Sequence, residues 1–239
     1  MARSSATQRH KKRQNRSRKP RSSPTPRPVP VQSAGNNPVP VPRSGGMAGH
    51  MGTTRYWDCA KPACGYVQSS YTPARSCDKS GVNTVDPSAT SGASGGDAYT
   101  CNSYAPWSVS DTKSYGFAAF GLDTSHCCKC FDITFTTTAI AGKTMTIQVL
   151  NLGSSAEDGG GHFDLQMPGG GIGMVNGCTS QWGPNVQWGK QFGGLTSNTC
   201  SSLPGPLQAG CKYAVHFSFY SCFLFSRNYW FSHSKKYLI

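Results

Sequence analysis

Two of the ten acidic residues lie in sequence surroundings that suit catalysis. Asp58 follows two aromatic residues and precedes a cysteine, and Asp164 lies in the run Gly-Gly-Gly-His-Phe-Asp-Leu. Apolar neighbours withdraw a carboxyl group from water, which raises its pKa. A general acid that works near neutral pH needs a raised pKa. We therefore predict that Asp58 and Asp164 are catalytic, although composition alone favours the simpler alternative of a cap or surface acid and a turn residue.

The residues around these two acids also indicate the class of substrate. Tyr and Trp rings stack on sugar rings, and two carboxyl groups beside such rings are the minimum for glycoside hydrolysis. Most of the other acids stand in polar, turn-like sequence, and Asp132 falls on the polar face of a predicted strand.

Segments of alternating polarity predict the strands that must position these acids. Apolar and polar residues alternate over residues 130–137, 143–150 and 213–219, which is typical of half-buried strands. Residues 110–121 are the one segment that we expect to hold a short helix. The sequence therefore predicts a mainly β fold, a barrel with long loops pinned by disulfides.

The eleven cysteines, all between positions 59 and 222, indicate an oxidising compartment. Cys127-Cys128-Lys129-Cys130 lacks the paired C-x₂-C spacing of a zinc site, so we predict disulfides and no metal. Disulfides imply an extracellular, secreted protein, yet no signal peptide is visible in the chain. The Arg- and Ser-rich start loosely resembles a mitochondrial transit peptide, but a reducing organelle conflicts with so many cysteines.

The formal charge of +13 is concentrated in residues 1–50, which hold 11 Lys and Arg, no acid and half of the 16 prolines. This composition predicts a disordered basic tail, residues 1–22, followed by a Pro-rich linker. Binding of nucleic acid or another anionic polymer is the alternative function for this tail; we favour a solvated tail and no nucleic-acid partner. Residues 51–239 form the predicted catalytic domain, and no apolar stretch is long enough to span a membrane.

Several short motifs together resemble glycoside hydrolase family 45, the small endoglucanases. Residues 53–65 (TTRYWDCAKPACG) resemble the family's N-terminal signature, and residues 162–171 (HFDLQMPGGG) resemble its second signature. Further motifs follow in family order at 98–101, 115–119, 127–130, 177–178, 200 and 206–211. The resemblance covers residues 53 to about 217, and the tail after 217 resembles nothing in the family. We expect that this tail is truncated or mistranslated.

The resemblance implies a six-stranded double-psi β-barrel with an open groove, and an enzyme that hydrolyses internal β-1,4 bonds of cellulose and related β-glucans. It implies inversion, with Asp164 as the general acid and Asp58 as the general base. Inversion predicts roughly 6.5–9.5 Å between the two carboxyl groups. The family's third, auxiliary acid falls on Glu157 or Asp158, and we favour Asp158.

The resemblance also implies the substrate-binding residues: Thr54, Tyr56, Trp57, Lys61, Tyr66 and His162. It implies no cofactor, and we expect a monomer. The disulfides that it implies are Cys59–Cys178, Cys64–Cys127, Cys77–Cys101 and Cys200–Cys211. The pairing of Cys128, Cys130 and Cys222 stays open. One family bridge is lost cleanly, because alanine stands at both of its positions, Ala60 and Ala93.

A non-hydrolytic, expansin-like wall-loosening protein is the alternative in a different class. Expansins resemble this family in their barrel and keep a His-Phe-Asp segment, but they lack the base. Asp58 in an intact Tyr-Trp-Asp-Cys context favours the hydrolase.

Overall fold

The computed structural model describes residues 49–153, 162–196, 199–216 and 229–236, with the backbone alone from 214 onward. All of these residues belong to one compact unit. The predicted basic tail and linker lie outside the described residues, except for positions 49 and 50. The auxiliary acid Asp158 and Cys222 lie outside them as well.

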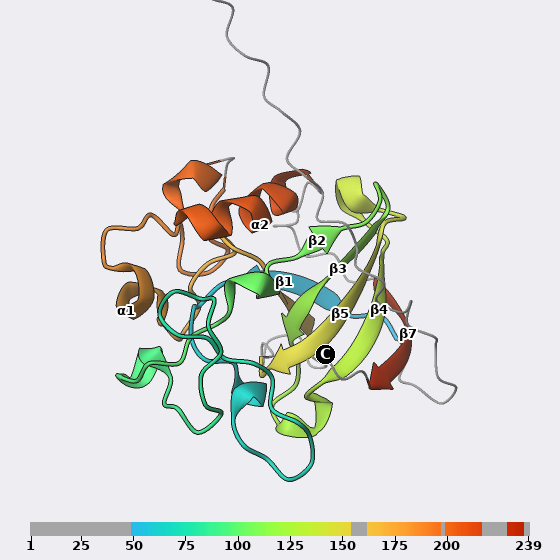
Figure 1. The fold of residues 1–239 in the computed structure, drawn as a ribbon. Helices are drawn as coiled ribbons and strands as arrows, with labels where there is room; N and C mark the ends of the chain where they lie inside the picture. Colours follow the sequence, from blue (N-terminus) through green and yellow to red (C-terminus); the bar gives the residue numbers. More distant parts are fainter. Residues whose placement is uncertain (1–48, 154–161, 197–198, 217–228, 237–239) are drawn as a thin grey trace, which may run out of the picture. The chain divides into compact units, whose positions relative to one another are not determined.

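One mixed β-sheet forms the framework of this unit (Figure 1). Its strands in spatial order are β1 (Gly52–Tyr56), β6 (His162–Gln166), β3 (Lys113–Ala119), β5 (Thr144–Asn151), β4 (Lys129–Phe135) and β7 (Tyr229–Lys236), and β2 (Trp107–Ser108) pairs with β3. The β1–β6 and β3–β5 pairs are parallel and the others antiparallel. The fold is mainly β, as predicted, but the pairing among the described residues runs from β1 to β7 without closing.

Short helices occupy the connections between these strands. The α-helices are α1 (Cys178–Trp182) and α2 (Gly205–His216). The 3-10 helices are η1 (Ala63–Gly65), η2 (Gly92–Ser94), η3 (Asn102–Tyr104), η4 (Thr124–His126), η5 (Thr138–Ile140) and η7 (Cys200–Ser202). None of the described helices is long and apolar enough to cross a membrane.

The alternating residues of β4 and β5 build the core, which confirms the two predicted strands over 130–137 and 143–150. Phe131, Ile133 and Phe135 of β4 are buried against Met145 and Ile147 of β5. Each such side chain contributes about 1.5–3 kcal/mol by leaving water. The alternation of apolar and polar residues therefore predicted correctly that these apolar side chains face the core.

The helix predicted over residues 110–121 is wrong, because this segment contains β3. The strand is central, between β5 and β6, and it is buried on both faces for most of its length. Small residues allow this burial: a Cβ on Gly116 would lie 2.4 Å from Cε of Met145. A central strand of this kind does not show the alternation that identifies half-buried strands.

The strand predicted over residues 213–219 is also wrong as far as the structure describes it. Residues 213–216 form the last turn of α2, and residues 217–219 lie outside the described part. Pro206 stands in the first turn, where a proline is tolerated. Leu207 and Cys211, four residues apart, are fully buried on one face of the helix. Helical spacing across the whole segment therefore outweighs the local alternation that begins at Tyr213.

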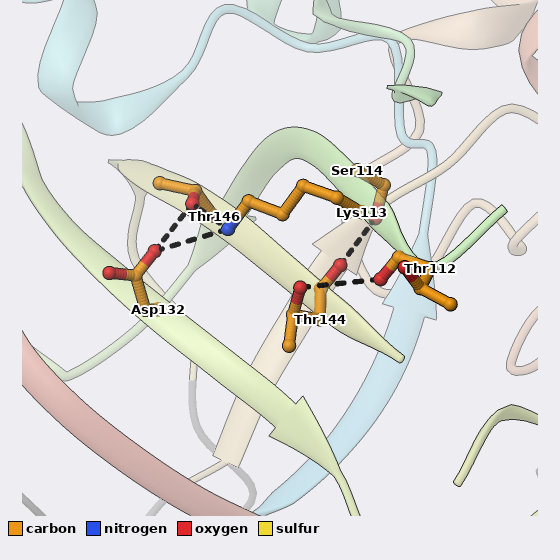
Figure 2. A network of polar contacts seen from close by, with 6 residues as sticks. All are labelled: Thr112, Lys113, Ser114, Asp132, Thr144 and Thr146. Atoms are coloured by element: carbon orange, nitrogen blue, oxygen red, sulfur yellow. Dashed lines mark hydrogen bonds and ion pairs between the residues drawn. The ribbon is translucent and has the colours of Figure 1, made fainter. Parts of the chain in front are cut away.

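A network of polar side chains connects β3, β5 and β4 (Figure 2). Nζ of Lys113 on β3 donates to Oγ1 of Thr146 at 2.7 Å, and that hydroxyl donates to Asp132 on β4 at 2.5 Å. Lys113 and Asp132 also form a half-exposed ion pair at 3.5 Å. Asp132 thus links strands on the polar face of β4, as its place in the predicted strand indicated.

Four disulfides connect the loops to each other and to the sheet. The bridges are Cys59–Cys178, Cys64–Cys127, Cys77–Cys101 and Cys200–Cys211, so all four predicted pairings are confirmed. Cys128 forms no disulfide within the described residues, and its thiol is half-buried against the carbonyl of Thr72. The long connections between strands are therefore covalently pinned.

Candidate active site

Asp164 lies in the middle of β6, between two neighbouring strands. Thr54 of β1 and Ala119 of β3 are its register partners. Oδ1 of Asp164 accepts a hydrogen bond from the Thr54 hydroxyl and lies 2.6 Å from Nε2 of His162. The Asp164 side chain is 22% exposed, whereas His162 is buried. The carboxyl group is therefore held in place by Thr54 and His162 and is accessible from solvent.

Glycine at position 153 makes room for the Asp164 carboxyl group. The backbone N–H of Gly153 donates to the carbonyl of Gly121 at 3.0 Å, so the segments after β3 and β5 meet here. A Cβ on Gly153 would lie 2.5 Å from Oδ2 of Asp164 and 3.0 Å from Cβ of Ala119. A side chain at this position would displace the carboxyl group.

Asp58 follows β1 and is buried, with 8% of its surface exposed. Burial raises its pKa to about 7, although hydrogen bonds from the backbone N–H groups of Ala60 and Asp58 itself oppose the rise. Oδ1 accepts from Ala60 N at 3.0 Å. The next residue, Cys59, has a left-handed φ of 60° and is bridged to Cys178. The disulfide thus holds an unfavourable backbone conformation beside Asp58.

Tyr56 connects the two carboxyl groups electrostatically. Its pKa is raised well above the ordinary value, first by burial, then by the charge of Asp58, and to a smaller extent by that of Asp164. A hydrogen bond from Nδ2 of Asn151, at 3.2 Å, opposes this rise. The phenol therefore stays neutral at working pH, and both predicted catalytic groups act on the same hydroxyl.

Lys61 holds two loops together. Its Nζ donates to the carbonyls of Pro87 at 2.6 Å and Ala89 at 2.7 Å, and lies 3.9 Å from the centre of the Tyr66 ring. Burial lowers the pKa of Lys61, and the charge of Asp86 opposes this shift. Lys61 therefore anchors the 86–89 loop to the segment that follows Asp58, and Tyr66 is more exposed than Lys61.

The other predicted substrate-binding residues differ in exposure. Thr54 is exposed and Tyr56 half-buried, so both lie where a ligand can reach them. Trp57 is only 1% exposed, and its backbone N–H donates to the carbonyl of Gly171. Trp57 therefore packs in the core behind Asp58 in the structure described.

Ser91 occupies the place where the resemblance implies a lost disulfide. Its hydroxyl oxygen accepts from the backbone N–H groups of Lys61 at 3.2 Å and Ala93 at 3.3 Å. The two segments that carry Ala60 and Ala93 are therefore still joined, through one serine. No single-residue signal in the sequence pointed to Ser91, Asn151 or Gly153, because their partners are distant along the chain.

The described residues contain no group of three or more His, Cys, Asp or Glu side chains that would suit a metal ion. The ionisable groups that the two predicted catalytic positions supply are the carboxyl groups of Asp58 and Asp164. A pair of carboxyl groups, one buried and one accessible, fits the pair of Asp or Glu residues that most glycoside hydrolases use.

Comparison with known proteins narrows this class to one family. The profile of glycosyl hydrolase family 45 matches residues 48–225. An endoglucanase of Cryptopygus antarcticus is 46% identical over 169 residues, which are 67% of this chain and 74% of that protein. An endoglucanase of Phaedon cochleariae is 38% identical over 192 residues, 76% of this chain and 78% of that protein.

A solved structure agrees with these sequence matches. The crystal structure of a cellulase from the Antarctic springtail Cryptopygus antarcticus superposes with a TM-score of 0.70 at 40% identity, covering 78% of this chain and 90% of that one. The chain belongs to glycosyl hydrolase family 45 and is a glycoside hydrolase of the cellulase type.

Proposed function

We propose that the protein hydrolyses internal β-1,4-glucosidic bonds of cellulose and related β-glucans, with inversion at the anomeric carbon. Asp164 protonates the leaving oxygen, and Asp58 removes a proton from the attacking water on the opposite face of the sugar. The observation that carries this proposal is a pair of differently exposed carboxyl groups on neighbouring strands. Asp164 of β6 is accessible and binds Thr54 of β1, and Asp58 is buried just after β1. The endoglucanase relatives support the choice of polymer.

The two carboxyl groups have surroundings that fit these roles. Asp164 is accessible and is held through Oδ1 by Thr54 and His162, so Oδ2 is left for the glycosidic oxygen. The pKa of Asp58 is raised to about 7, so its ionised form accepts a proton more readily than an ordinary carboxylate does, and this pKa lies near neutral working pH. The double-psi type of the β fold, the auxiliary acid Asp158, secretion and a monomeric state complete the proposal.

Substrates with different leaving groups test the two roles separately. We expect Asp164→Asn and Asp58→Asn each to lower the kcat for barley β-glucan by about 10²–10⁴-fold. An aryl cello-oligosaccharide with a 2,4-dinitrophenolate leaving group needs no acid. It should therefore restore turnover in Asp164→Asn but not in Asp58→Asn. The reverse pattern would exchange the roles, and parent-like activity in both variants would refute them.

Proton NMR of the first products tests the stereochemistry. Inversion predicts that the α-anomer appears first from a β-linked glucan, before mutarotation mixes the anomers. An initial β-anomer would refute inversion. Non-hydrolytic wall loosening, the alternative function, predicts polymer creep with no new reducing ends in either assay.

A further inference from the structure

Asn151, the last residue of β5, joins three parts of the site through one amide. Its Oδ1 accepts from the backbone N–H of Ala63 at 2.9 Å and from that of Leu152 at 3.0 Å. Its Nδ2 donates to the hydroxyl of Tyr56 at 3.2 Å. Ala63 begins η1, which also carries Cys64 of the Cys64–Cys127 bridge. The amide is therefore anchored to a covalently fixed loop.

The two backbone donors fix which way the amide faces. An amide oxygen only accepts hydrogen bonds and an amide nitrogen only donates them. A flipped amide would place its NH₂ group against two N–H groups and lose both bonds. The oxygen of Asn151 must therefore face Ala63 and Leu152, and its nitrogen must face Tyr56.

This orientation decides the role of the Tyr56 hydroxyl. Its oxygen accepts from Asn151, so its single proton is left for another acceptor. The acceptors whose charge reaches this hydroxyl are the carboxylates of Asp58 and, more weakly, Asp164. Tyr56 also lies two residues after Thr54 on β1, so its side chain leaves the same face of the strand as that of Thr54, whose hydroxyl donates to Asp164.

We propose that Asn151 is a positioning residue that sets Tyr56 as a hydrogen-bond donor toward the reacting water or sugar between Asp58 and Asp164. This inference rests on the proposed function. Asn151 does not contact the substrate itself; it acts by keeping the Tyr56 proton directed away from the protein scaffold and toward the cleavage point.

Substitution of Asn151 with aspartate removes the side-chain donor and keeps the side-chain acceptor. Asn151→Asp keeps an oxygen for Ala63 and Leu152 but replaces the NH₂ group with an acceptor, so the Tyr56 proton turns toward position 151. We expect a fall in kcat for β-glucan of about tenfold, the effect of one hydrogen bond to the reacting centre, at the variant's own pH optimum. Asn151→Ala removes both halves of the amide and should also lower the melting temperature.

A double-mutant cycle with Tyr56→Phe is the decisive measurement. If Asn151 acts through the hydroxyl, Asn151→Asp should lower kcat by less than about twofold once that hydroxyl is gone. Full additivity of the two losses would overturn the proposal and leave Asn151 a purely structural residue. Gln148→Ala is the control, because it removes a second amide from β5, one that donates to the Cys128 carbonyl. This variant should keep parent kcat.

The parent enzyme separates this proposal from the proposed function. An inactive parent would refute the hydrolase function, whereas an active parent with an additive cycle would refute only the role of Asn151.

Discussion

Asp58 shows how burial prepares one residue for its role. The carboxyl group has no ion-pair partner among the described residues, and desolvation raises its pKa to about 7. Its two hydrogen-bond donors are backbone N–H groups, which only partly offset that burial. The same burial that makes Asp58 a stronger base therefore opposes its ionisation in the folded protein.

This burial predicts a pH-dependent stability. Because the folded pKa lies above the unfolded value of 3.8, the folded state binds more protons between pH 4 and pH 7. The contribution of Asp58 to stability is therefore greatest below about pH 4 and is lost as the pH rises to about 7. Asp58→Asn should raise the melting temperature relative to the parent more at pH 8 than at pH 5. Differential scanning calorimetry at the two pH values measures this.

An exposed acid provides the control for this measurement. Asp111 lies at the surface, so Asp111→Asn should change the melting temperature similarly at both pH values. An equal effect of Asp58→Asn at pH 5 and pH 8 would show that the carboxyl group is not desolvated.

At the scale of secondary structure, the pairing of β6 with β1 and β3 positions the carboxyl group of Asp164. β6 pairs in parallel with β1 and antiparallel with β3, so Asp164 has a neighbour on either side. Beyond these strands, Gly121 and Gly153 pair in an isolated bridge. This close approach leaves room for a carboxyl group but for no further side chain.

Gly153→Ala should reduce activity more than stability. The added Cβ would lie 2.5 Å from Oδ2 of Asp164, so this partly exposed carboxyl group would have to rotate away from Thr54 and His162 while the strands keep their pairing. We expect kcat to fall at least about tenfold, because small misplacements of a catalytic group are costly. Thermal unfolding measures stability. Gly205→Ala, where a Cβ meets open space, is the control and should keep kcat. Unchanged kcat in Gly153→Ala would show that Asp164 is not confined there.

For the molecule as a whole, disulfides join distant parts of the sequence. The Cys59–Cys178 bridge spans 119 residues and adjoins Asp58, whereas Cys200–Cys211 spans 11 residues and links η7 to α2. A longer closed loop restricts the unfolded chain more strongly. The two bridges should therefore differ in both stability and function.

Removing each bridge with two alanines tests this difference. The chain-entropy relation predicts a loss of about 5 kcal/mol for Cys59–Cys178 and about 3 kcal/mol for Cys200–Cys211. Urea unfolding at pH 7 measures both losses. The first pair should also lower the kcat of the folded enzyme, because the left-handed backbone at Cys59 would relax beside Asp58. Equal kcat in the two double variants would contradict that coupling.

The sequence by itself determined the two interior strands, the family, the candidate acids and the four confirmed disulfides. Alternation of apolar and polar residues is a local signal of a strand buried on one face, so the sequence alone predicts β4 and β5. The signatures around Asp58 and Asp164 are contiguous, and a contiguous motif needs no three-dimensional information. The cysteine pairs followed from the positions of family motifs.

Only the tertiary structure decided the features that depend on distant partners. The β3 segment lacks alternation because most of it is buried on both faces, and residues 213–216 alternate in polarity although they form the last turn of α2. Thr54 reaches Asp164 across 110 residues of sequence, and Asn151 reaches Tyr56 across 95. Such contacts exist only after the sheet has brought its strands together, so local patterns in the chain cannot reveal them.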